Sequence, residues 1–398
     1  MTSPRLFDLD LPDLVLEGGG VVTSHRARGW WWGPEADLPA LTDRVAFLPR
    51  EALTEPARVV RHGPVETARP AAAASSPEVG AEAAGRHDRR SDRAPLLSAA
   101  RPELDAAVPT VLLVHALTGD ARAGGEGGWW SPLVGVGKPL DPTKVRLLCF
   151  NNLGSNYGSS GPLDAGWPAG ASPTTVDQAR ALWSALDALG VTRLHLAAGG
   201  SLGGMILLSM AALRPGAIER LFPLGATAFA TAWLTGFNHV QRQAIALDPV
   251  RGLEVARQLA MLTYRAEPGL ESNQSRTLPL APGATGRFRI EGYLEHQGMK
   301  LSARFDARAY VALLDAMDSH DVLHREPRLS RLEGTKALVV DIDTDALYTP
   351  AQVEVLRRAL RDAGARVDAA TLRSLHGHDA FLIEWDQLAP LVTRALAL

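Results

Sequence analysis

The stretch Gly-Gly-Ser-Leu-Gly-Gly-Met at residues 199–205 combines a nucleophilic side chain with the glycines that a sharp turn requires. An apolar run precedes it and another follows it, which predicts a strand, a tight turn and a helix with Ser201 at the tip. Side chains two positions before and after such a serine would collide, which accounts for Gly199 and Gly203. We therefore predict that Ser201 is a nucleophile whose hydroxyl stands clear of a β-sheet.

A carboxylate that could complete a catalytic triad with Ser201 lies after a later strand, as the chain order of an α/β-hydrolase sheet requires. Residues 336–340 form a short apolar strand, and the turn after it carries Asp343 and Asp345 before Pro350 opens a helix. Asp345 is our choice, although chain position alone does not separate it from Asp343. In a purely structural interpretation these aspartates cap the helix.

Two histidines follow the last predicted strand, at residues 366–371. One of them must take the proton of the serine hydroxyl while the acid holds its other ring nitrogen. We choose His378, although His376 satisfies the same order, and the pair could instead be loop residues or metal ligands. The arrival of serine, acid and histidine in the required order favours a catalytic triad without a metal.

The third requirement is an oxyanion hole made by two backbone N–H groups. The apolar strand predicted at residues 110–114 runs into His115-Ala116-Leu117-Thr118-Gly119. We expect the amides of Leu117 and Leu202 to be the donors. His115 is interpreted as a packed, hydrogen-bonded residue at the strand end.

Five blocks of the sequence together resemble the signature of the homoserine O-acetyltransferase family. They keep the family's order at residues 115–119, 128–130, 199–205, 237–245 and 377–382. The resemblance implies an α/β-hydrolase fold that moves an acyl group from coenzyme A to the hydroxyl of homoserine, in methionine biosynthesis, or of serine in some members. It makes Ser201 the nucleophile, Asp345 the acid and His378 the base. Acyl-CoA is then a co-substrate, and no bound cofactor is expected.

The same resemblance assigns two acceptor-binding residues. Arg242 matches the arginine that binds the carboxylate of the amino acid, and Asp379 matches the aspartate that binds its amino group. A guanidinium suits a carboxylate and a carboxylate suits an ammonium. As structural alternatives, Arg242 is a solvated helix charge and Asp379 a helix N-cap.

Several positions depart from the family pattern. Asn152, Ser155 and Asn156 stand where homoserine enzymes usually carry smaller or apolar residues and a cysteine, the segment 175–178 replaces an arginine–aspartate pair, and Ile206 replaces a common glutamine. These changes lean toward serine as the acceptor. They do not decide it, because one methylene in an acceptor is worth only ~1–3 kcal/mol.

Three functional classes compete. We expect a ping-pong acetyltransferase that uses acetyl-CoA and L-homoserine, with a serine O-acetyl- or O-succinyltransferase of cysteine biosynthesis as the alternative. An esterase would use the same triad with water, but it has no need to pair Arg242 with Asp379. A binding or regulatory protein would have no need of a complete triad.

The composition is consistent with an enzyme that acts on small molecules. The chain has 398 residues, 46% of them apolar, and a net charge of −3, which gives no reason to expect nucleic acid. The single Cys149 is expected to pack in a strand. The N-terminus lacks a signal-peptide pattern and no stretch could span a membrane, so we expect a cytoplasmic protein.

The chain divides into a hydrolase core and a lid. We assign the core to residues 1–226 and 320–398, with a glycine hairpin turn at 18–20 and a disordered, Ala-, Arg-, Pro- and Ser-rich insertion at about 67–107. Residues 227–319 form the helical lid, with helices at 233–247, 251–265, 291–302 and 307–317. By the family resemblance, lid helices also make a homodimer.

Overall fold

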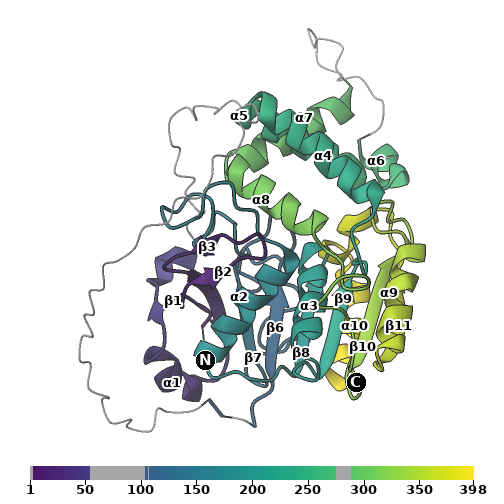
Figure 1. Cartoon of the computed structure of the whole chain (residues 1–398). Coiled ribbons are helices and arrows are strands. Elements are labelled where there is room, and N and C mark those ends of the chain that lie inside the picture. The colour runs from purple at the N-terminus through teal and green to yellow at the C-terminus, as the bar shows by residue number, and fades with distance from the viewer. Residues whose placement is uncertain (1–2, 54–103, 106, 275–287) are drawn as a thin grey trace, which may run out of the picture. The chain divides into compact units, whose positions relative to one another are not determined.

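The computed structural model describes residues 3–53, 104–105, 107–274 and 288–398. The insertion predicted at about 67–107 lies almost entirely outside the described residues. Within them the fold is α/β, with a central sheet and helices on both of its faces (Figure 1).

The described residues form a nine-stranded sheet in the order β11-β10-β9-β8-β6-β7-β4-β1-β5. Six neighbouring strands, β11 to β7 in that order, pair in parallel, and β4, β1 and β5 extend the sheet with antiparallel pairing. The strands are β1 Arg5–Asp10, β4 Arg26–Trp32, β5 Ala46–Phe47, β6 Thr110–Val114, β7 Arg146–Phe150, β8 Leu196–Gly200, β9 Arg220–Leu224, β10 Lys336–Ile342 and β11 Arg366–Leu372. The α/β-hydrolase fold predicted from the sequence is confirmed.

Two apolar layers cover the sheet because its parallel strands are buried on both faces. On one face, α2 (Thr175–Ala188), α3 (Leu202–Leu213) and α9 (Pro350–Asp362) share a core cluster. On the other face, α10 (Trp385–Ala397) packs with the segment around Trp130.

The N-terminal segment adds a hairpin and the antiparallel strands. β2 (Leu14–Val15) pairs with β3 (Val21–Val22) across the glycine turn, as predicted. Trp30 and Trp31 of β4 are fully buried, and Cys149 is buried in β7, so all three are packing residues. The short helices are α1 Leu38–Thr42 and the 3₁₀ turns Glu35–Asp37, Arg50–Leu53 and Gly377–Leu382.

Among the described residues, five helices lie between β9 and β10 in the chain; they lie above the sheet in Figure 1 and are called the lid here. They are α4 Ala232–Leu247, α5 Pro249–Tyr264, α6 Glu267–Asn273, α7 Arg289–Ser302 and α8 Ala307–Asp318. Four were predicted, and the short α6 was not. Asp248 separates α4 from α5 because its side chain accepts two N–H groups of α5 and Pro249 occupies the first helical position. None of the helices in the described part of the chain has the length and apolar character that crossing a membrane requires.

His320 ties the end of the lid to the core. It lies just after α8, and its Nε2 is 2.9 Å from the carbonyl oxygen of Thr227 while its Nδ1 is 3.3 Å from Oγ1 of Thr175. Burial lowers the pKa of His320 to about 4. The folded protein therefore holds this imidazole neutral at pH values where an unfolded chain protonates it.

We predict that this burial makes the fold acid-sensitive. Between an unfolded-state pKa of about 6.5 and the folded-state pKa of about 4, the unfolded chain binds more protons, so stability is lost as pH falls through this window. From pH 7 to pH 5 the contribution of His320 to the free energy of unfolding should fall by ~2 kcal/mol. Urea denaturation of the parent and of His320→Gln at both pH values measures it. An equal pH dependence in the two proteins would contradict the assignment.

Candidate active site

Ser201 occupies a strained turn between β8 and α3, with φ 56° and ψ −128°. The turn closes against the end of β6. A Cβ atom added at Gly203 would lie 2.2 Å from the carbonyl oxygen of Val114, and one added at Gly199 would lie 2.8 Å from the same atom. No side chain fits at either glycine, which is the steric reason inferred from the sequence.

Asp345 and His378 lie together. Nδ1 of His378 is 2.6 Å from Oδ2 of Asp345, and both side chains are almost fully buried. Oδ1 of Asp345 accepts the backbone N–H groups of Leu347 and Tyr348, each at 2.8 Å. These bonds fix the carboxylate, so the imidazole bears its proton on Nδ1 and presents Nε2 as a base.

Nε2 of His378 is buried and makes no hydrogen bond within the described residues. That is the nitrogen that would accept the proton of Ser201. The serine lies at the end of β8 and the histidine after β11, both at the carboxyl edge of the parallel strands. Catalytic hydrogen bonds are often long in a ligand-free enzyme and shorten when substrate binds.

The two alternative residues have other partners. Asp343 accepts the backbone N–H of Ser374 at 3.0 Å. His376 is partly exposed, and its Nδ1 is 3.5 Å from a guanidinium nitrogen of Arg265. The structure therefore brings Asp345 and His378 together and leaves Asp343 and His376 outside that pair.

Aromatic rings enclose the imidazole of His378. The ring centroids of Tyr348, Phe381 and Tyr264 lie 4.8, 5.6 and 5.7 Å from it. Burial raises the pKa of Tyr264 to about 12 and that of Tyr348 well above its usual range. The nearby Ser201 hydroxyl offsets part of this increase for Tyr348 by lowering its pKa. The Tyr348 hydroxyl nevertheless makes no hydrogen bond within the described residues. Both phenols stay neutral, so they shield the base without competing for its proton.

The two predicted oxyanion donors lie in the turns that the sequence indicated. Leu202 is the first residue of α3, where amides have no intrahelical carbonyl partner, and Leu117 is buried in the loop after β6. His115 packs as expected. Its Nδ1 is 2.8 Å from the carbonyl oxygen of Ala116, and its Nε2 accepts the N–H of Asn152 at 3.2 Å. Burial lowers the pKa of His115, so it is a neutral structural residue.

The two predicted acceptor-binding residues are both ion-paired. Arg242 donates to Asp315 at 3.1 Å and to Asp318 at 2.6 Å, all within the lid. Nε of Arg265 lies 3.0 Å from Oδ2 of Asp379. The structure thus places Asp379 beside the triad histidine, whereas it holds Arg242 between two carboxylates.

Arg257 and Tyr264 were missed by the sequence reasoning. The guanidinium of Arg257 lies over the ring of Tyr264, 5.7 Å from its centroid, and Tyr264 in turn packs against His378. Arg257 is half-buried, and no carboxylate of the described chain lies within ion-pair distance of it. Their spacing of seven places them on one face of α5, a signal that the sequence contained.

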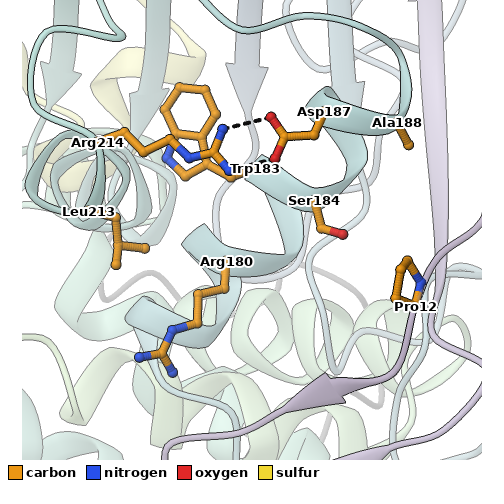
Figure 2. A pocket seen from close by; sticks show the side chains of 8 residues that line it. All are labelled: Pro12, Arg180, Trp183, Ser184, Asp187, Ala188, Leu213 and Arg214. Atoms are coloured by element: carbon orange, nitrogen blue, oxygen red, sulfur yellow. Dashed lines mark hydrogen bonds and ion pairs between the residues drawn. The ribbon is translucent and has the colours of Figure 1, made fainter.

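A surface hollow and possible metal sites were the other candidates for a functional site. A hollow of about 560 Å³ is lined by residues that include Arg180, Trp183 and Arg214 (Figure 2). It lies at the C-terminal end of the 12-residue α3, about 18 Å from Ser201. Within the described ranges, no cluster of three His, Cys, Asp or Glu side chains could hold a metal ion.

Comparison with known proteins identifies the family of this chain. The α/β-hydrolase-fold family profile matches residues 109–367. The homoserine O-acetyltransferase of Moorella thermoacetica is 37% identical over 326 residues, which are 73% of this chain and 87% of the relative. The homoserine O-acetyltransferase of Thermus thermophilus is 40% identical over 319 residues, or 71% and 80% of the two chains.

Solved structures show the same fold. The homoserine O-acetyltransferase of Staphylococcus aureus superposes with a TM-score of 0.70 at 25% identity, covering 100% of this chain and 96% of that one. Esterase E22 gives a TM-score of 0.70 at 16% identity, covering both chains completely, and at that identity it shows the fold alone.

We predict that the paired acid and histidine are needed for acylation of Ser201. His378→Ala and Asp345→Asn should each slow acylation by p-nitrophenyl acetate about 10³–10⁴-fold, because the first removes the base and the second its orienting acceptor. The matched controls His376→Ala and Asp343→Asn should stay within about tenfold of the parent. Stopped-flow release of nitrophenol measures all four. A larger loss in His376→Ala than in His378→Ala would reassign the base.

Proposed function

Because the chain belongs to the homoserine O-acetyltransferase family, we propose that this O-acyltransferase moves an acyl group from acyl-CoA to the hydroxyl of L-homoserine. Acetyl-CoA is the first candidate donor, as the names of its relatives suggest. Succinyl-CoA as donor and serine as acceptor are the alternatives. The proposed setting is methionine biosynthesis in the cytoplasm.

In the first half-reaction, Ser201 attacks the thioester carbonyl while Nε2 of His378 takes its proton. The amides of Leu117 and Leu202 hold the oxyanion of the tetrahedral intermediate. The C–S bond then breaks, and coenzyme A leaves as a thiol with the proton from His378. An acyl ester on Ser201 remains.

In the second half-reaction, the acceptor hydroxyl replaces the thiol. His378 removes its proton, the oxygen attacks the acyl carbonyl, and the bond to Oγ of Ser201 breaks with return of the proton. Asp345 keeps Nδ1 protonated throughout and stabilises the imidazolium. The ping-pong order follows from the acyl-enzyme, because coenzyme A leaves Ser201 acylated before the acceptor hydroxyl reacts.

The observation that carries the proposal is a pair of opposite charges beside the base. Asp379 follows His378 directly, and its Oδ2 lies 3.0 Å from Nε of Arg265. The guanidinium of Arg257 has no ion-pair partner within the described chain and lies over the ring of Tyr264, which packs against the imidazole of His378. We assign the acceptor's ammonium to Asp379 and its carboxylate to Arg257, because Arg242 is already neutralised by two aspartates.

We also propose a homodimer through the lid. Val240 and Leu247 lie seven residues apart on α4 and are exposed, as are Val250, Val255 and Leu262 of α5. Large apolar side chains gathered on neighbouring helices are typical of subunit interfaces.

The transferase proposal predicts that an amino acid accelerates turnover. Thiol release from acetyl-CoA or succinyl-CoA should be slow alone and at least tenfold faster with homoserine or serine, because a bound acceptor outcompetes water. Ellman's reagent follows the thiol, and intact-mass spectrometry follows the acyl-enzyme, which Ser201→Ala should lack. Release that no amino acid accelerates would support a hydrolase instead.

Two arginine variants test which guanidinium binds the carboxylate of the acceptor. Arg257→Lys should raise the KM for the acceptor roughly tenfold or more while acylation by acyl-CoA stays near the parent rate, because only the carboxylate needs the bidentate fork. Arg242→Lys, the variant suggested by the sequence, should change the acceptor KM less. Single-turnover acylation and decay of the preformed acyl-enzyme measure the two steps. The opposite ranking would return the carboxylate site to Arg242.

A further inference from the structure

The loop that carries Leu117 turns back on itself directly after β6. The N–H of Gly119 bonds the carbonyl oxygen of Ala116 at 3.0 Å, and Nδ1 of His115 lies 2.8 Å from the same oxygen. These contacts close a turn with Leu117 and Thr118 at its two central positions. The carbonyl oxygen of Thr118 takes no part in closing the turn, so it is free to bond another segment of the chain.

Arg304 is the lid residue that reaches this turn. It lies between α7 and α8, and its Nη1 donates to the carbonyl oxygen of Thr118 at 2.8 Å and to the hydroxyl of Tyr157. No carboxylate of the described residues pairs with Arg304, and Asp120, the acid of the same loop, is paired with Arg122. The guanidinium charge is therefore held against a carbonyl dipole of the oxyanion loop and is not neutralised by an acid.

The backbone of Arg304 is itself fixed. Its carbonyl oxygen accepts Nδ2 of Asn156 at 3.1 Å. The next residue, Phe305, is buried and packs edge-on against Tyr157, with ring centroids 5.4 Å apart. The guanidinium thus extends from a well-packed corner of the lid, and its hydrogen bond joins that corner to the turn of residues 116–119.

The two oxyanion donors differ in how they are held. Leu202 begins the 12-residue helix α3, whereas Leu117 lies in a turn outside any helix of the described residues. An oxyanion hole is effective because its donors are in place before the charge develops. A misplacement of about 1 Å in an active site can cost about 10²-fold in rate. A contact that fixes the turn of Leu117 therefore bears directly on the rate of acylation.

We propose that Arg304 is a positioning residue for the oxyanion hole. Through the carbonyl of Thr118 it holds the amide of Leu117 toward Ser201, so that docking of the lid and stabilisation of the oxyanion are coupled. This role rests on the proposed function, because it needs the oxyanion donors assigned there, but it does not depend on which acyl donor or acceptor is used. Arg304 stays protonated throughout and exchanges no proton with the substrate.

The oxyanion can be titrated directly. 1,1,1-Trifluoroacetone adds to a nucleophilic serine as a hemiketal, and ionisation of the hemiketal hydroxyl gives an oxyanion like that of the tetrahedral intermediate. In Arg304→Gln the pKa of this hydroxyl, followed by fluorine NMR, should rise by about one unit or more, because the anion loses stabilisation. Acylation by p-nitrophenyl acetate should slow about tenfold or more. Arg304→Lys keeps the charge and a donor, so it should fall between Arg304→Gln and the parent in both measurements.

The matched control is Arg308→Gln, because Arg308 lies in the first turn of α8 and pairs with Asp306. It should keep the parent's hemiketal pKa and acylation rate. An Arg304→Gln variant with the parent's hemiketal pKa overturns the inference even if acylation is slower, since a purely structural role would produce that result. A parent that forms no hemiketal overturns it as well. If acetyl-CoA and succinyl-CoA both fail to acylate Ser201 while the ester and the ketone respond as expected, the transferase proposal fails and the role of Arg304 stands.

Discussion

The contact that the rest of the site depends on is the crossing of α3 over the end of β6. The backbone at Gly203 lies so close to the carbonyl of Val114 that a methyl group would overlap it. This contact bends the chain at Ser201 into its strained conformation and sets the first amide of α3 beside the loop that carries Leu117. Nucleophile and oxyanion donors therefore come from one steric arrangement, and the cost of the strain is met by the buried sheet around it.

The lid packs on the loop that carries His378 as closely as α3 packs on the end of β6. A Cβ at Gly377 would lie 2.7 Å from the backbone nitrogen of Ala266, and one at Gly269 would lie 2.1 Å from the carbonyl of Leu375. The corner between α5 and α6 thus packs on the histidine loop, backbone against backbone. This contact brings Tyr264 to the imidazole, with Arg257 over the ring of Tyr264, so the proposed acceptor site depends on the docking of the lid.

Charge and polarity are distributed unevenly around Ser201. The histidine side has Asp379 and an unpaired guanidinium on Arg257, as an amino acid with two opposite charges would need. The other side has Arg304, which donates to the oxyanion loop and has no carboxylate partner within the described residues.

The sequence by itself determined the fold class, and it predicted a nucleophile and the chain order of acid and base, because these depend on local signals: apolar strands, flanking glycines and a proline that opens a helix. It did not separate Asp345 from Asp343 or His378 from His376, since residues two apart occupy equivalent places in a linear pattern. It also assigned the acceptor's carboxylate to Arg242, because residue type and spacing do not show that this guanidinium already has two carboxylate partners. Only the tertiary structure decided these points, because ion pairing, burial and the docking of the lid arise from contacts between segments far apart in the chain.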